Sequence, residues 1–265
     1  MSHLITPLTF PDEAFFLQWH ITDACNLRCR HCYCTDFTYQ PFQNEKISFI
    51  LEQYSALLNY LHKPGRVQFA GGEPFASPIL FDAIRYAREL GMAVRVLSNG
   101  TLASDEICQK LKEAGCYIVQ VSIEGKKKTN DFIRMKGSYK KALEGMKLMR
   151  EHGIEITVAM TLSRANFQDI EHVFKLASRY SNRIGFHRLV PIGTGKSMEK
   201  DMLSPEELLA CYEKILLLKK EYPELDVPLR DPLWQSYISK SQQKSVTGCS
   251  AGYNGLCIGS NGDVY

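Results

Sequence analysis

The stretch ACNLRCRHCYC, residues 24–34, contains four of the nine cysteines of this 265-residue chain. Cys25, Cys29 and Cys32 follow a C-x3-C-x2-C spacing, and Cys34 comes two residues later. Structural zinc sites use four ligands, commonly in two separated pairs, so a set of three matches them poorly. Three thiolates can instead bind three irons of a [4Fe–4S] cube and leave the fourth iron open. The spacing therefore favours an iron–sulfur site, with Cys34 expected outside the ligand set.

The overall composition predicts one large globular domain in the cytoplasm. The chain is 45% hydrophobic and 23% charged, and its net charge of +3 gives no reason to expect a nucleic-acid or membrane partner. Its first residues lack the basic segment and apolar run of a secretory signal, and no stretch approaches the roughly 18 apolar residues of a membrane helix. In the reducing cytosol, clustered thiols more often bind metal or act catalytically than form disulfides.

Short β-rich runs alternate along the chain with stretches of helical periodicity. Strands are expected at 15–22, 66–70, 93–98, 117–123, 154–161 and 184–191, and helices at 47–61, 79–90, 105–114, 139–152 and 169–181. Ser104 is the expected N-cap of the third helix, and a further amphipathic helix is expected after Ser204 and Pro205. Repeated strand–helix units imply parallel strands joined by right-handed crossovers. The sequence predicts an α/β fold, either a partial barrel or an open sheet.

The loops that follow the first four predicted strands carry unusual residues. The cysteine-rich segment follows the first strand, and GGEP (71–74), SNGT (98–101) and SIEG (122–125) follow the next three. In parallel α/β folds all such loops open on one face of the sheet, and that face carries the chemistry. We therefore expect residues from these loops to converge on one ligand.

CNLRCRHC followed by GGEP resembles the radical S-adenosylmethionine (radical SAM) superfamily, and the whole length of the chain fits the partial, TIM-like (β/α)6 barrel of that family. The resemblance implies a [4Fe–4S] cluster held by Cys25, Cys29 and Cys32, with SAM bound to the open iron. One electron from the cluster would cleave SAM to methionine and a 5′-deoxyadenosyl radical that abstracts hydrogen from a substrate. The protein would supply position and exclusion of water, and no catalytic side chain is assigned.

The resemblance also implies contacts to SAM. Gly71 and Gly72 would lie against its amino group with Glu73 nearby, and Arg134 would bind its carboxylate through a bidentate fork. The remaining candidates are Ser122, which would hydrogen-bond SAM, Glu124, where relatives usually have Asp, Ser98 and Asn99 of the SNGT turn, and Val190 and Tyr33 near the adenine. Ordinary alternatives stay open: a plain turn for the glycines and Asn99, a solvated arginine for Arg134, and core packing for Val190 and Tyr33.

The chain is expected to divide into a radical SAM core at 1–195, a linker with the amphipathic helix at 196–248, and a small element at 249–265. The last segment is similar to the opening of a SPASM or twitch extension, which binds auxiliary [4Fe–4S] clusters. Cys249 and Gly262 fit that pattern, whereas its next cysteine would follow Tyr265. Cys249 is thus a candidate ligand of an auxiliary cluster. Cys257 is expected in a hairpin core, with a second ligand of that cluster as its alternative role.

A SPASM-like tail favours a maturase that acts on a ribosomally made peptide or protein, with a low-potential electron donor of the flavodoxin or ferredoxin type. Two alternatives remain. The first is a radical SAM enzyme of small-molecule cofactor biosynthesis, of the haem or quinone type. The second is a non-catalytic metal-binding module that recognises a peptide. The lysine run GKKKTN (125–130) is expected to be a solvated loop, and attraction of an acidic substrate is its alternative role.

Overall fold

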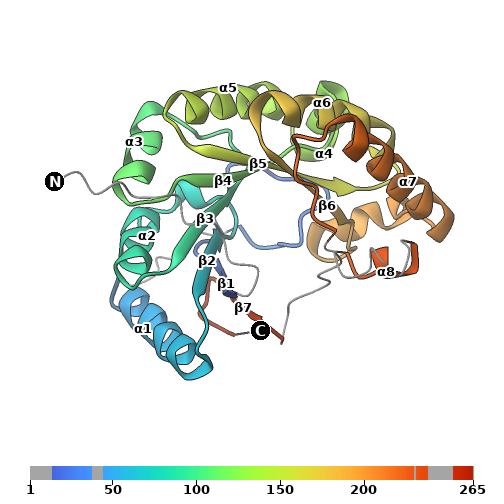
Figure 1. Ribbon diagram of the computed structural model, residues 1–265. Helices are drawn as coiled ribbons and strands as arrows, with labels where there is room; N and C mark the ends of the chain where they lie inside the picture. The colour runs from blue at the N-terminus through green and yellow to red at the C-terminus, as the bar shows by residue number, and fades with distance from the viewer. Residues whose placement is uncertain (1–13, 38–43, 230, 238–252, 265) are drawn as a thin grey trace.

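The computed structural model describes residues 14–37, 44–229, 231–237 and 253–264. Seven strands form one parallel sheet in the order β6-β5-β4-β3-β2-β1-β7. The strands are β1 (Phe15–His20), β2 (Gly65–Ala70), β3 (Ala93–Ser98), β4 (Ile118–Ser122), β5 (Glu155–Leu162), β6 (Arg183–Arg188) and β7 (Gly255–Ile258). The sheet curls into a half-barrel with helices on its outer side, as Figure 1 shows, which confirms the predicted partial barrel.

The helices between the strands supply the outer layer and bury its core. They are α1 (Asn44–Leu61), α2 (Leu80–Glu89), α3 (Asp105–Glu113), α4 (Lys127–Arg134), α5 (Ser138–Glu151), α6 (Ile170–Tyr180), α7 (Pro205–Glu221) and α8 (Trp234–Tyr237), with 3-10 turns η1 (Pro74–Ala76), η2 (Phe167–Asp169) and η3 (Gly193–Asp201). Ser104 caps α3 by accepting from the Ile107 amide at 3.2 Å, as predicted. Ser204 and Glu207 form a capping box at the start of α7.

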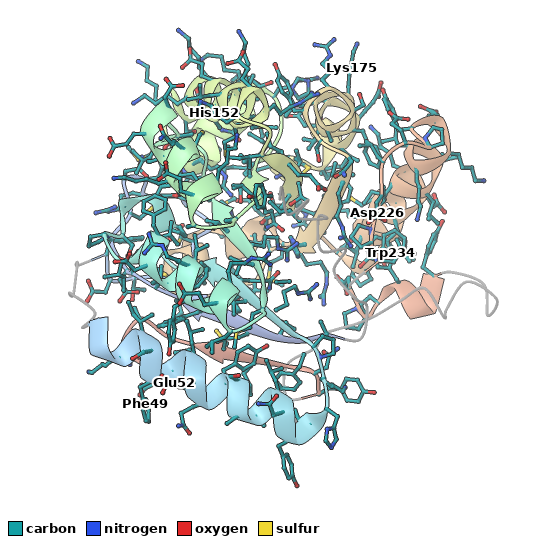
Figure 2. All side chains as sticks on the ribbon, turned by 60° about the vertical axis from the view of Figure 1, so that its left-hand side comes forward. Phe49, Glu52, His152, Lys175, Asp226 and Trp234 are labelled. Atoms are coloured by element: carbon teal, nitrogen blue, oxygen red, sulfur yellow. The ribbon has the colours of Figure 1, made fainter. Side chains whose placement is uncertain are left out.

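Burial alternates along β1 and separates two environments. Leu17 and Trp19 are fully buried, while Gln18, between them, lines a cavity together with Gln120 of β4 and His187 of β6. Because successive side chains of a strand point to opposite faces, the apolar set packs against the helices and the polar set faces the inside of the half-barrel. Figure 2 shows the outermost layer at α1, where Phe49 and Glu52 lie on the exposed side of the helix.

Two segments differ from the sequence-based expectation. Lys127, within the predicted lysine-rich loop, begins the helix α4. In the tail, residues 255–258 form β7, which pairs in parallel with β1 and aligns Cys257 with Gln18. The chain then turns back, as expected of a hairpin, to an antiparallel bridge between Ile258 and Val264, but Cys257 is only partly buried. The free edge of β1 offers unpaired backbone groups, and pairing with β7 satisfies them. Cys249 lies outside the described residues, and none of the described helices is long and apolar enough to cross a membrane.

Candidate functional site

The strand-to-helix loops converge on one cavity of about 490 Å³ at the carboxyl ends of the strands. All of the predicted site residues within the described chain line this cavity except Glu73 and Glu124: Cys25, Cys29, Cys32, Tyr33, Gly71, Gly72, Ser98, Asn99, Ser122, Arg134 and Val190. Its volume is in the range of small-molecule sites, which run from about 300 to 1,000 Å³. The structure therefore confirms the prediction that these loops converge on one cavity.

The three cysteines of the C-x3-C-x2-C motif all face this cavity, and Cys34 does not line it. Cys34 instead contacts Cys32 through its thiol, which lowers the pKa of Cys32 to about 6. Burial raises the pKa of Cys29 to about 11, although Arg134 opposes the rise. Three thiols beside an open space fit a cube that is bound at three corners. The raised pKa of Cys29 does not oppose this, because a bound iron deprotonates a coordinating thiol.

The geometry does not place the three thiols around a single ion. Among the described residues, no three His, Cys, Asp or Glu side chains are close enough to hold one metal ion together. A cube does not require such convergence, because each of its cysteines binds a different iron.

The Gly71–Gly72 turn lies against the cluster loop, which we define as residues 24–34. The Gly72 amide donates to the Thr22 carbonyl at 2.7 Å, and the Glu73 amide donates to the Ala24 carbonyl at 2.8 Å. A Cβ atom added at Gly71, whose φ is +133°, would come within 2.3 Å of the Thr22 oxygen, and one at Gly72 within 2.3 Å of the Ala24 oxygen. Both positions thus need glycine to let the turn meet the loop backbone, and both also line the cavity.

Glu73 is completely buried behind the cavity wall. Its carboxylate accepts from the Ser98 hydroxyl at 2.7 Å, from the Asn99 amide at 2.7 Å and from the Phe75 amide at 3.1 Å. Burial raises the pKa of Glu73, and these hydrogen bonds oppose the rise. Glu73 therefore ties the turn after β2 to the turn after β3.

Asn99 links the turn after β3 to the cluster loop. Its side-chain amide donates to the side-chain oxygen Oδ1 of Asn26 at 2.9 Å, and the Asn26 side-chain amide in turn donates to the Thr101 hydroxyl at 2.8 Å. Asn99 also accepts from the Thr101 hydroxyl at 2.6 Å. The SNGT segment is thus both the turn and the cavity wall that the sequence left as alternatives.

Arg134 and Glu124 form a buried ion pair beside the cysteines. Nε and Nη2 of Arg134 donate to Oε1 of Glu124 at 2.9 and 2.5 Å, and the Thr161 amide donates to Oε2 at 2.8 Å. His31, on the cluster loop, lies 3.3 Å from the same Oε1. Burial alone would raise the pKa of Glu124, but Arg134 and His31 outweigh it and lower the value to about 2. Glu124 thus keeps a buried arginine charged and oriented at the cavity wall.

Residues 193–195, after β6, also bind the cluster loop, in addition to the turns after β2 and β3. The Thr194 hydroxyl donates to the carbonyls of Cys29 and Cys32 at 3.0 and 3.1 Å, and the Gly195 amide donates to the Cys32 carbonyl at 2.9 Å. Gly193, with φ of +59°, has no room for a Cβ, which would lie 2.0 Å from the Tyr33 oxygen. The blue coil after β1 in Figure 1 runs across to β6, where these contacts occur.

The remaining candidates stand around the cavity mouth. Tyr33 is 45% exposed and lies beside His20, with its hydroxyl 3.3 Å from the Gly71 carbonyl. Val190, after β6, is 56% exposed, and Ser122 ends β4. Tyr33 and Val190 are therefore available to a ligand and do not belong to the core.

The residues that hold the cluster loop were not predicted from the sequence. Thr194 lies in GTG (193–195), which belongs to no predicted strand, helix or motif, and Asn26 lies between two cysteines. The two glycines around Thr194 were a signal of close backbone approach, but the partner of that approach is more than 150 residues away. Only the fold brings it near.

Comparison with known proteins defines the class. The radical SAM superfamily matches residues 19–177, and the chain belongs to this superfamily. Members of the family use a [4Fe–4S] cluster and SAM.

Among curated relatives, Fe-coproporphyrin III synthase of Methanosarcina barkeri is 36% identical over 221 residues, which are 82% of this chain and 54% of that protein. Mycofactocin maturase MftC of Mycolicibacterium smegmatis is 26% identical over 72% of this chain and 48% of its own length. The chain thus spans about half the length of these relatives. The crystal structure of Streptococcus suis SuiB bound to S-adenosylmethionine shares the fold, with a TM-score of 0.77, 17% identity and coverage of 95% of this chain and 60% of that one.

Replacing Glu124 by Gln tests the buried ion pair. We expect a loss of about 3 kcal/mol in the free energy of unfolding at pH 7, because Arg134 then lacks its counter-charge. The folded pKa of about 2 lies below the ordinary 4.5, so the carboxylate stabilises the fold above about pH 4.5 and loses this effect as the pH falls toward 2. Urea unfolding should show that the difference in the free energy of unfolding between the variant and wild type becomes smaller as the pH falls through that range. A difference independent of pH would contradict this account.

Replacing Thr194 by Val tests the hydrogen bonds from the Thr194 hydroxyl to the cluster loop. Valine keeps the shape but loses the hydroxyl, so the carbonyls of Cys29 and Cys32 each lose one of their two donors and keep a backbone amide. In protein reconstituted with iron and sulfide, we expect iron loss to a chelator to be about tenfold faster, as for other residues that orient metal ligands. The Thr194→Ser variant restores the donor and should retain iron like wild type. Equal retention in the Val and Ser variants would remove the hydroxyl from the explanation.

Proposed function

We propose that this chain is the catalytic core of a radical SAM enzyme in which Cys25, Cys29 and Cys32 bind the [4Fe–4S] cluster. The observation that carries the proposal is the placement of these three thiols at one wall of the cavity, with Cys34 outside it. The bound cluster and SAM would supply the one-electron cleavage chemistry of the family.

The protein's own residues would position SAM and keep water out. Arg134 lines the cavity and is fixed by Glu124, so a guanidinium is already oriented where a carboxylate can bind. Gly71 and Gly72 present backbone at the cavity wall, and Ser98, Asn99 and Ser122 add polar side chains there. Tyr33 and Val190 offer apolar surface at the mouth for the adenine. Positioning of this kind is the part of the reaction that the protein contributes.

We infer that the substrate is a peptide or protein. The cavity of about 490 Å³ opens to solvent at a mouth where Tyr33 and Val190 are exposed. A peptide needs to insert only the side chain that reacts. The similarity to mycofactocin maturases supports the same substrate class.

A tetrapyrrole is the second candidate, because the 36% identity to Fe-coproporphyrin III synthase exceeds the 26% identity to the maturase. An auxiliary cluster at Cys249 and a flavodoxin- or ferredoxin-type donor remain parts of the proposal.

Cysteine variants test the cluster assignment. Wild-type protein reconstituted without oxygen should release 5′-deoxyadenosine from SAM after reduction with dithionite, as measured by liquid chromatography and mass spectrometry. Cys29→Ala should lose both the cluster and this product, because only two thiolates remain. Cys34→Ala should keep the iron content and the product. Unchanged iron in Cys29→Ala, or its loss in Cys34→Ala, would show that the ligand set is wrong.

A second assay separates the two substrate classes. The reduced enzyme and SAM are incubated either with peptides encoded by short reading frames beside its gene or with iron coproporphyrin III. We expect a mass change in a peptide and 5′-deoxyadenosine above the substrate-free level, because a peptide can insert one side chain through the open mouth of the cavity. A mass change in the porphyrin alone would reverse the assignment.

A further inference from the structure

The outer side of the cluster loop packs against the end of α4 and forms a continuous surface with it. The Arg30 amide donates to the Ile133 carbonyl at 2.8 Å, and the Arg28 amide donates to the sulfur of Met135 at 3.1 Å. The Arg30 guanidinium lies 4.1 Å from the centre of the Phe132 ring. Phe132 and Met135 are 51% and 42% exposed, so this contact leaves apolar surface open to solvent.

Lysines extend this surface along α4. Lys128 lies one turn before Phe132 and on the same side of the helix, and Lys136 follows Met135; both are exposed. We call the exposed set Arg28, Arg30, Lys128, Phe132, Met135 and Lys136 the α4 patch. Asp131, the acidic residue of α4, is largely buried and is bound by Lys127 and the Tyr139 amide. The patch is therefore strongly basic with an apolar centre.

The α4 patch lies directly behind a cysteine of the cluster motif. Cys29 faces the cavity, while its neighbours Arg28 and Arg30 are both exposed. Arg30 lies over the Phe132 ring of α4, and the Arg28 guanidinium donates to the carbonyls of Cys25 and Leu27. One residue of backbone thus separates the patch from a thiol that we propose as an iron ligand. SAM and substrate would occupy the cavity side of that thiol, and the outer side stays accessible.

We propose that the α4 patch docks an acidic protein that carries one electron to the cluster. This inference rests on the proposed function, since only a reductive cluster needs such a carrier. At the patch the carrier is oxidised by one electron and the cluster is reduced by one, and no bond forms or breaks there. Opposite charges accelerate such encounters and fix their orientation. Phe132 and Met135 provide the apolar contact of a small, transient interface.

The test is the double variant Lys128→Glu and Lys136→Glu, which reverses two charges without changing the cluster loop. Its control is Lys112→Glu and Lys175→Glu, two exposed lysines on α3 and α6; Figure 2 shows Lys175 on the outer side of α6. Flavodoxin binding to the protein is measured by isothermal titration calorimetry and should weaken about tenfold in the patch variant but not in the control. Release of 5′-deoxyadenosine is measured with dithionite, and separately with flavodoxin, its reductase and NADPH. We expect the flavodoxin concentration for half-maximal rate to rise about tenfold in the patch variant, with an unchanged dithionite rate.

The control variant should match wild type with both reductants, and added salt should weaken the flavodoxin-driven rate of wild type. An unchanged flavodoxin requirement in the patch variant would overturn the docking proposal. If, in addition, the patch variant modified an acidic peptide more slowly than wild type under dithionite, the patch would be a substrate site. A wild-type protein that releases no 5′-deoxyadenosine with dithionite would instead overturn the proposed function.

Discussion

The cluster loop has no helix or strand of its own, and its shape depends on hydrogen bonds from segments far away in the sequence. Buried backbone groups must find partners, and here contacts at four places fix the loop, three through backbone groups and one through the Asn26 side chain. The turn after β2 binds residues 22–24, Asn99 binds Asn26, the end of α4 binds residues 28–30, and Thr194 with Gly195 binds the carbonyls of Cys29 and Cys32. Each contact comes from the carboxyl end of a strand or the segment after it, so the half-barrel sets the position of every cysteine.

The cavity wall beside the cluster loop also contains a charged side chain, Arg134, that is largely shielded from solvent. A buried guanidinium is costly unless it is paired and hydrogen-bonded. Glu124 meets this need through one oxygen on Arg134 and the other on the Thr161 amide. Glu124 and Glu73 stand behind the wall and orient the residues that line it. In the proposed site, these carboxylates would therefore act on a ligand through Arg134, Ser98 and Asn99 rather than by touching it.

The proposed roles divide the cluster loop into two sides. The cavity side receives the thiols together with the polar groups that would contact SAM, and the outer side carries exposed arginines beside α4. A layout of this kind lets an electron enter from one side while the substrate occupies the other. The open mouth, with Tyr33 and Val190 at its rim, suits a substrate that inserts only one group at a time.

Much of this arrangement was encoded locally. Alternating strand and helix patterns predicted six of the strands, the caps at Ser104 and Ser204 and the shared face of the loops, because periodicity and capping depend on nearby residues. The spacing of Cys25, Cys29 and Cys32 likewise singled out the cavity thiols, since a short loop forces its own side chains together. Tertiary structure decided the rest: the pairing of β7 with β1, the place of Glu124 behind Arg134 and the grip of Thr194 on the cluster loop. These contacts join residues from 10 to about 240 positions apart, and their partners are set by how the sheet curls, which no short stretch of sequence contains.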